Sequence, residues 1–164
     1  HADSINWDWR LLASLIYQES RFNPKARSWA GAKGLMQMMP VAARQMGVKN
    51  RLDPPDNIRG GTKYLDLLHH KFNTVGDSVQ RLKFAIAAYN CGYYHVKDAQ
   101  NLAVVRGLDK LKWDDNVEKM ILELSYPRNY KHEVVKYGYV RGIEPFVYVE
   151  QIFDRYEHYL KFVE

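Results

Sequence analysis

Glu19 stands where acid–base chemistry needs a carboxyl group. It follows Leu12 by seven residues and Leu15 by four, so on a helix it shares their apolar stripe. Desolvation on such a stripe raises the pKa of a carboxyl group, and a raised pKa allows general acid catalysis near neutral pH. The competing interpretation is a glutamate near a helix end that pairs with Arg21 or Lys25. Position alone favours this ordinary pairing.

A second candidate, Gln37, lies in the segment 31–40. Gly31 and Gly34 are three residues apart and indicate a tight backbone path. A buried glutamine must find hydrogen-bond partners, and a sugar hydroxyl or amide could supply them. A packed turn with adaptable methionines in the core explains the pattern equally well. The apolar neighbours of this glutamine are Leu35, Met36, Met38 and Met39.

The segment 87–92 is a third candidate, because Tyr89 and Asn90 come at the end of a predicted helix. The alanines before them allow close approach of another helix. A core tyrosine followed by a capping asparagine also explains this segment, and that explanation suffices when the segment is taken alone.

Metal and cofactor chemistry find little support in the sequence. His132 and the glutamate after it begin like a zinc-protease motif, but Lys136 stands where the second histidine is required. His69 and His70 are adjacent, so on a helix they point in different directions. Cys91 is the only cysteine, which excludes an intrachain disulfide. We expect no metal and no cofactor.

Helical periodicity dominates the chain and predicts an all-α, or nearly all-α, fold. Residues 53–56 form a predicted turn whose aspartates are candidates to cap the next helix. A short β piece is expected around residues 35–38, and a short helix from residue 40 to the glycine at 47. The other predicted helices cover residues 7–20, 58–72, 78–89, 114–124, 129–137 and 148–162.

Length and composition are typical of one globular domain over residues 1–164, with 46% hydrophobic and 26% charged residues. No stretch has the roughly 20 apolar residues that span a membrane. The chain begins abruptly at His1 without a basic and then apolar leader, so we expect a domain excised from a longer protein. The net charge of +5 favours an anionic partner, but no nucleic-acid recognition motif accompanies it. Nucleic-acid binding is therefore not expected.

Taken together, these segments resemble the Slt-type lytic transglycosylases in their order and spacing. Each motif is weakly specific, but the ordered set is strongly specific and covers nearly the whole chain. Residues 9–20 and 137–152 are most similar to the membrane-bound lytic transglycosylase F type. The other matching pieces are Glu19–Pro24, Ser28, Gly31–Pro40, Asn57–Leu65 and Ala88–Asn90.

The resemblance implies a lysozyme-like helical domain, of the goose-lysozyme and Slt type, with an extended substrate cleft. It implies cleavage of the β-1,4 bond between N-acetylmuramic acid and N-acetylglucosamine in the glycan strands of peptidoglycan. This cleavage uses no water and leaves a 1,6-anhydro end. It also implies the periplasm of a Gram-negative bacterium, outer-membrane association of the full-length protein, and a solute-binding-like regulatory module before this domain.

The resemblance also assigns roles by position. Glu19 matches the catalytic acid/base, and Pro145, Cys91, Tyr93 and Tyr94 depart from the residues common in the family. These departures concern the late segment and the cleft wall. The implied substrate-binding positions are Ser28, Gln37, Met39, Tyr89, Asn90, Glu144 and Tyr148.

One carboxyl group suffices for such a reaction, because the attacking hydroxyl belongs to the substrate itself. Ordinary glycosidases use two carboxyl groups, and no second acid in a motif pairs clearly with Glu19. One alternative is a lysozyme-like hydrolase, a muramidase, on the same substrate. The other is a catalytically inactive glycan-binding module, against which the joint presence of Glu19, Gln37, Tyr89 and Asn90 argues.

Overall fold

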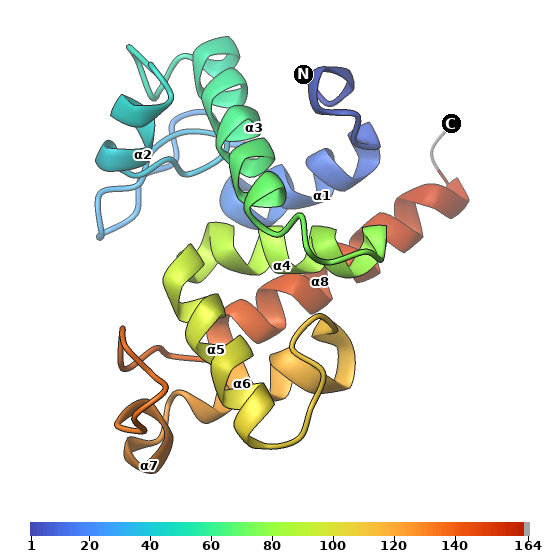
Figure 1. The fold of residues 1–164 in the computed structure, drawn as a ribbon. Helices are drawn as coiled ribbons and strands as arrows, with labels where there is room; N and C mark the ends of the chain where they lie inside the picture. The colour runs from blue at the N-terminus through green and yellow to red at the C-terminus, as the bar shows by residue number, and fades with distance from the viewer. Residues whose placement is uncertain (163–164) are drawn as a thin grey trace. The chain divides into compact units, whose positions relative to one another are not determined.

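The computed structural model describes residues 1–162, and helices dominate its fold (Figure 1). Within these residues no β-strand forms beyond isolated bridges, which pair Lys33 with Arg27 and with Met38. The predicted all-α class is therefore confirmed. None of the helices in this described part of the chain has both the length and the apolar character needed to cross a bilayer.

The chain divides into two compact units. The first comprises residues 1–66 and 151–162, and the second comprises residues 67–150. The helices of the first unit are η1 (Asp3–Ile5), α1 (Trp9–Ser20), α2 (Pro40–Gln45), most of α3 (Pro54–Lys71) and the second half of α8 (Ile143–Phe162). Its core includes the fully buried side chains of Leu11, Leu15, Met36, Met38 and Leu65. Each such side chain contributes roughly 2 kcal/mol to stability relative to its exposed state.

Asp8 sets the start of α1. Its Oδ1 accepts a hydrogen bond from the backbone N–H of Arg10 at 2.8 Å, which caps the helix. Its carboxylate also forms an ion pair with the Arg10 guanidinium at 3.0 Å and accepts a hydrogen bond from the hydroxyl of Tyr156 at 3.2 Å. The side-chain hydrogen bond from Arg10 is the main cause that lowers the pKa of Asp8 below its ordinary 3.8. The helix therefore begins at Trp9, two residues after the predicted start.

The second unit contains the remainder of α3 and α8 together with α4 (Ser78–Cys91), α5 (Tyr93–Val105), the kinked turn η2 (Trp113–Val117), α6 (Glu118–Glu123) and α7 (Pro127–Tyr130). Helix α5 packs against α4 and α6 (Figure 1). In the core the ring of Phe84 stacks on Phe72, with 5.3 Å between centroids, and meets Trp113 edge-on at 5.6 Å. These aromatic contacts tie the start of the unit to η2.

Several predicted helices have different ends in the structure. Helix α3 begins at Pro54, inside the predicted turn, where Asp53 Oδ2 accepts a hydrogen bond from Asp56 N at 3.1 Å. Helix α8 begins five residues before the predicted position 148. The short β piece expected around residues 35–38 is limited to the isolated bridge between Met38 and Lys33, because residues 34–37 form a turn.

In the second unit the sequence analysis missed one helix, and one helix that it predicted is wrong. Helix α5 has no counterpart among the predicted helices, and the helix predicted over residues 129–137 is limited to the short α7. The buried carboxylate of Asp98 accepts hydrogen bonds from the backbone N–H groups of Lys136 at 2.9 Å and Tyr137 at 2.7 Å. A helix would use those N–H groups internally, so this side-chain contact replaces helical structure there.

Candidate active site

Glu19 lies in the last turn of α1 and is half-buried. The helix ends directly after it because Arg21 and Phe22 both adopt the left-handed conformation, with φ of 49° and 62°. The backbone N–H of Arg21 donates to the carbonyl of Tyr17 at 2.8 Å and closes the helix end. Helix α1 therefore ends because two consecutive residues are left-handed, and this happens before the chain reaches the proline at position 24. Glu19 is held at the junction between a rigid helix and the loop that follows.

Ser28 organises the first part of that loop. Its Oγ accepts a hydrogen bond from Ala32 N at 3.0 Å, and its backbone N–H donates to Ala32 O, also at 3.0 Å. Its carbonyl accepts from Gly31 N at 3.1 Å. These three bonds close a tight turn, so the hydroxyl of Ser28 has a defined position in the fold.

Gln37 closes the second part of the loop. Its backbone is left-handed, with φ of 45°, and its side-chain Nε2 donates to Gly34 O at 2.9 Å and to Ala26 O at 3.2 Å. The amide nitrogen is thus satisfied by the fold itself, as the packed-turn interpretation predicts. The neighbouring side chain of Met39 is 44% exposed and lies on the surface of the first unit.

Asn57 fixes this loop from α3. The residue is fully buried, and its Oδ1 accepts from Met36 N at 2.8 Å. Its Nδ2 donates to Lys33 O at 2.9 Å and to Arg51 O at 2.7 Å. Gly34 has φ of 83°, and a Cβ there would collide with the Asn57 amide and with Arg51 O. Glycine is therefore required at 34 for its backbone conformation and for this close approach.

Sequence reasoning did not single out Asn57 or Arg51 as parts of the site. Arg51 Nη1 donates to Gly31 O at 2.8 Å and to Met38 O at 3.0 Å, so it spans the loop. The available signal was weak: a polar asparagine early in a helix, followed by two glycines. Gly60 and Gly61 are required because a Cβ on either would collide with side chains packed against α3, Val48 and Met36 respectively.

The other predicted positions lie in the second unit. Tyr89 and Asn90 occupy the last turn of α4, with Tyr89 half-buried and Asn90 exposed. The helix ends at Gly92, whose φ is 95°, so the glycine and not the asparagine is the C-terminal cap. Glu144 is exposed and pairs with Arg141 at 3.1 Å. Tyr148, by contrast, is buried, with 6% exposure.

An exposed aromatic group also marks the second unit. The rings of Tyr94 and Tyr137 stack with centroids 4.3 Å apart and planes 17° apart. The ammonium of Lys71 lies 4.6 Å from the ring centre of Tyr93. Half of Tyr94 and of Tyr137 remains exposed, at 51% and 53%. The tyrosines at 93 and 94, which depart from the family pattern, thus form part of an aromatic surface with polar edges.

The eight predicted site residues divide equally between the two units. The first unit holds Glu19, Ser28, Gln37 and Met39, and the second holds Tyr89, Asn90, Glu144 and Tyr148. Within the first unit, hydrogen bonds order the loop that carries Ser28 and Gln37 directly after the helix that carries Glu19.

Among residues 1–162 no group of three or more histidine, cysteine, aspartate or glutamate residues is arranged to hold a metal ion. Burial raises the pKa of the Cys91 thiol to about 12, so this thiol stays protonated at neutral pH.

Comparison with known proteins identifies the class to which this helical domain belongs. Residues 1–110 match the model of the transglycosylase SLT domain. The chain therefore belongs to the transglycosylase SLT domain family.

Curated relatives with high sequence identity show which type of transglycosylase the chain resembles. Proteins named membrane-bound lytic murein transglycosylase F are 44% identical over 156 residues in Desulfosudis oleivorans and 46% identical over 151 residues in Shewanella sediminis. These alignments cover 95% and 92% of this chain but 34% and 31% of the relatives. The chain thus spans about a third of the length of the curated relatives that it matches.

Solved structures show the same fold at lower identity. An inactive mutant of the lytic transglycosylase Slt from Pseudomonas aeruginosa has a TM-score of 0.62 at 23% identity, covering 98% of this chain and 23% of that one. The 70 kDa soluble lytic transglycosylase from Escherichia coli has the same TM-score and identity, covering 94% of this chain and 22% of that one. The predicted Slt-type fold is confirmed.

Proposed function

We propose that this chain is a peptidoglycan lytic transglycosylase with Glu19 as its single acid/base catalyst. The observation that carries the proposal is the place of Glu19 in an SLT-family chain. It is held in the last turn of α1, directly before the loop that Asn57 and Arg51 fix by hydrogen bonds. A carboxyl group placed by a helix end and a rigid loop has the fixed position that general acid catalysis needs. The names of the relatives, lytic murein transglycosylases, give the substrate class.

The proposed reaction breaks the β-1,4 bond between N-acetylmuramic acid and N-acetylglucosamine. Protonated Glu19 donates its proton to the glycosidic oxygen, which leaves with the bonding electrons. The N-acetyl group of the muramic acid stabilises the positive charge that develops at C1. The ionised carboxylate of Glu19 then removes the proton from the C6 hydroxyl, whose oxygen bonds to C1 and closes the 1,6-anhydro ring. Glu19 ends protonated, as it began, and no water is consumed.

The other site positions have different proposed roles. Ser28 and Gln37 position the loop beside the catalytic carboxyl group, since their side chains already bond to its backbone. Met39 and Asn90, which are exposed, are suited to direct contact with the glycan, and Tyr89 is suited to a partly buried contact. Glu144 and Tyr148 also match cleft positions of the family. The exposure of Glu144 favours a surface contact, and the burial of Tyr148 favours a supporting one.

The names of the relatives support a cell-envelope location, because they describe membrane-bound proteins that act on murein. We extend this to the periplasm, where peptidoglycan lies, and to association of the full-length protein with the outer membrane. The relatives are about three times as long as this chain, which leaves room for the solute-binding-like regulatory module expected before this domain.

The test is mass spectrometry of purified peptidoglycan after digestion by the chain, with Glu19→Gln and Glu157→Gln alongside. Glu157 is an exposed glutamate of α8 in the same unit, so its variant controls for the loss of one charge. We expect products that end in 1,6-anhydro-muramic acid, a loss of at least about 100-fold in rate for Glu19→Gln, and normal rates for the control. Reducing ends in place of anhydro ends would establish the muramidase instead. Binding without cleavage by the unmodified chain would establish the glycan-binding module.

A further inference from the structure

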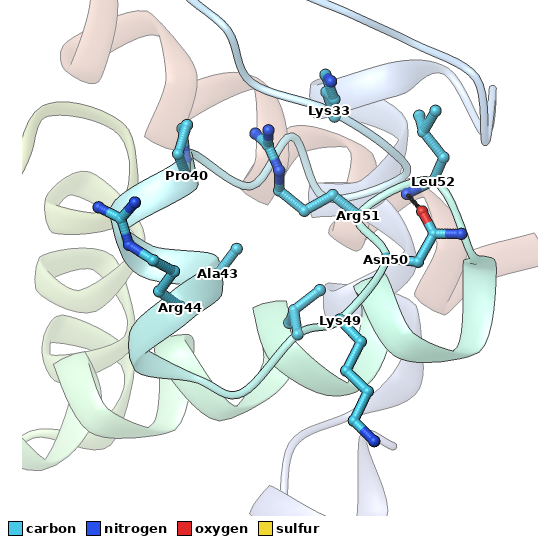
Figure 2. Close-up of a pocket in the computed structure, with 9 residues that line it drawn as sticks. Lys33, Pro40, Ala43, Arg44, Lys49, Asn50, Arg51 and Leu52 are labelled. Atoms are coloured by element: carbon cyan, nitrogen blue, oxygen red, sulfur yellow. Dashed lines mark hydrogen bonds between the residues drawn. The ribbon is translucent and has the colours of Figure 1, made fainter.

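A cavity of about 330 Å³ in the first unit lies between α2 and the segment 48–52, with Lys33 on one side (Figure 2). Nine residues line it, and four of them are basic: Lys33, Arg44, Lys49 and Arg51. None of the nine is acidic. Its volume falls at the lower end of the range for small-molecule sites, which is about 300–1,000 Å³. The cavity is thus large enough for one or two amino-acid residues.

The positive charge of this cavity is not neutralised within the described part of the chain. None of the four basic side chains forms an ion pair there. The neighbouring Asp56 is already engaged, because it pairs with Arg59 and accepts the backbone N–H groups of Lys49 at 2.7 Å and Asn50 at 2.8 Å. Asp53 accepts the N–H of Asp56 at the start of α3. The nearby acids therefore have other partners, and the cavity retains an excess of positive charge.

Arg51 is the basic group that is fixed in place. It is half-buried, and Nη1 is held by the carbonyls of Gly31 and Met38. These bonds use one of the three guanidinium nitrogens, which leaves the others for a ligand. Figure 2 shows the side chain of Arg51 extending from its segment toward α2, whereas the charged ends of Arg44 and Lys49 point outward at the rim. A guanidinium held in this way is prepared to bind a carboxylate with two parallel hydrogen bonds.

The rest of the lining is apolar. Pro40 and Ala43 of α2, with Val48 and Leu52 of the following segment, supply aliphatic surface, and Ala43 is buried. An inorganic anion gains nothing from such surface. A small aliphatic amino acid with a free carboxylate gains from both the apolar lining and the fixed guanidinium.

We propose that this cavity binds the carboxylate of a short peptide, namely the peptide stem that branches from the glycan strand. The proposal rests on the proposed function, since the stems belong to that substrate. The sugars that react carry no charge at the bond that breaks, whereas the stems carry free carboxylates next to aliphatic alanine residues. Because Arg51 also holds the carbonyls of Gly31 and Met38, binding here links the peptide to the loop that carries Gln37.

The test is an NMR titration of the ¹⁵N-labelled chain with the free tetrapeptide L-Ala–D-Glu–diaminopimelate–D-Ala. The same peptide with its carboxylates amidated, and inorganic phosphate, are titrated in parallel. We expect the acidic peptide to shift the amide signals of residues 43–52, and the amidated peptide and phosphate to leave them unchanged at equal concentration. Shifts located elsewhere, or equal shifts with phosphate or with the amidated peptide, would overturn the proposal.

Single substitutions test whether the peptide binds in this cavity. Arg51→Gln should raise the Kd of the tetrapeptide roughly tenfold, and Arg44→Gln, at the exposed rim, roughly threefold. Lys63→Gln, on the exposed side of α3, should change it less than twofold. Arg44 is exposed and bonds to no part of the loop, so its variant remains informative even if Arg51→Gln unfolds. An unchanged Kd in Arg44→Gln would contradict the proposal. The free peptide contains no glycosidic bond, so this result does not depend on whether the chain cleaves glycan.

Discussion

The side-chain oxygen of Asn57 accepts a hydrogen bond from the backbone N–H of Met36 at 2.8 Å, although 21 residues separate the two. The same side chain donates to Lys33 O and to Arg51 O. One buried amide on α3 thus bonds to three backbone groups, which belong to Lys33, Met36 and Arg51. The conformation of the loop after Glu19 therefore depends on this contact with α3 as well as on the sequence of the loop.

Replacing Asn57 by alanine should therefore lower the free energy of unfolding by about 2–4 kcal/mol, because three backbone groups lose a hydrogen bond to this fully buried side chain. Urea denaturation measures the change. Asn73→Ala, at an exposed position after α3, is the matched control and should stay within about 0.5 kcal/mol of the unmodified chain. Equal stability of the two variants would show that the loop does not depend on Asn57.

Two glycines of the loop allow the cost of backbone strain to be measured separately from the cost of a steric collision by an added Cβ. Gly34 and Gly31 both have positive φ, of 83° and 93°, but only at Gly34 would a Cβ meet other atoms, Arg51 O and the Asn57 amide. Gly31→Ala should cost roughly 1 kcal/mol from backbone strain alone, and Gly34→Ala roughly 3 kcal/mol or more. Thermal and urea unfolding of both variants check this order. The reverse order would contradict the described packing of the loop against α3.

The sequence predicted the features that depend on local pattern. The helical class, the place of Glu19 near a helix end and the short helix after Pro40 all follow from periodicity and from proline and glycine positions. The start of α1 was missed by two residues, because the Asp8 cap is a side-chain contact and Trp7 is buried outside the helix.

The missed helix α5 and the wrong helix at 129–137 share a physical cause, which is a polar side chain buried by contacts with residues distant in the sequence. The hydrophobic periodicity of helix α5 is interrupted in the sequence because the polar residues Asp98 and Gln100 lie on its buried face. Asp98 there binds the backbone of Lys136 and Tyr137, about 38 residues away, and this contact also removes the predicted helix at 129–137. The role of Asn57 is of the same kind. Such partners leave no periodic signal in a single sequence.

Acid should remove part of the stability of the first unit through Asp8. The hydrogen bond and ion pair with Arg10 lower the pKa of Asp8 in the folded chain below 3.8. The stabilisation is therefore fully present above pH 3.8 and is lost as the pH falls through the lower folded value. Asp8→Asn keeps a capping oxygen but removes the charge, so it should be less stable than the unmodified chain at pH 7.

Urea unfolding of both proteins between pH 7 and pH 2 measures this effect. The difference between them should shrink below pH 3.8 as the carboxylate of Asp8 becomes protonated. Asp154→Asn, at an exposed position of α8, serves as the control for loss of one negative charge. A difference for Asp8→Asn that stays constant down to pH 2 would mean that the charge of Asp8 contributes nothing.

Gln37 allows a positioning role to be distinguished from direct contact with substrate. Its Nε2 holds Gly34 O and Ala26 O, and Gln37→Glu replaces this donor by a carboxylate that faces the same two carbonyls. We expect a loss of about 1–3 kcal/mol in unfolding free energy and a fall in kcat on peptidoglycan, with KM little changed. Gln45→Glu, at the exposed end of α2, controls for the added charge. Normal stability with a raised KM would instead assign Gln37 to substrate binding, as its match to the family position implies.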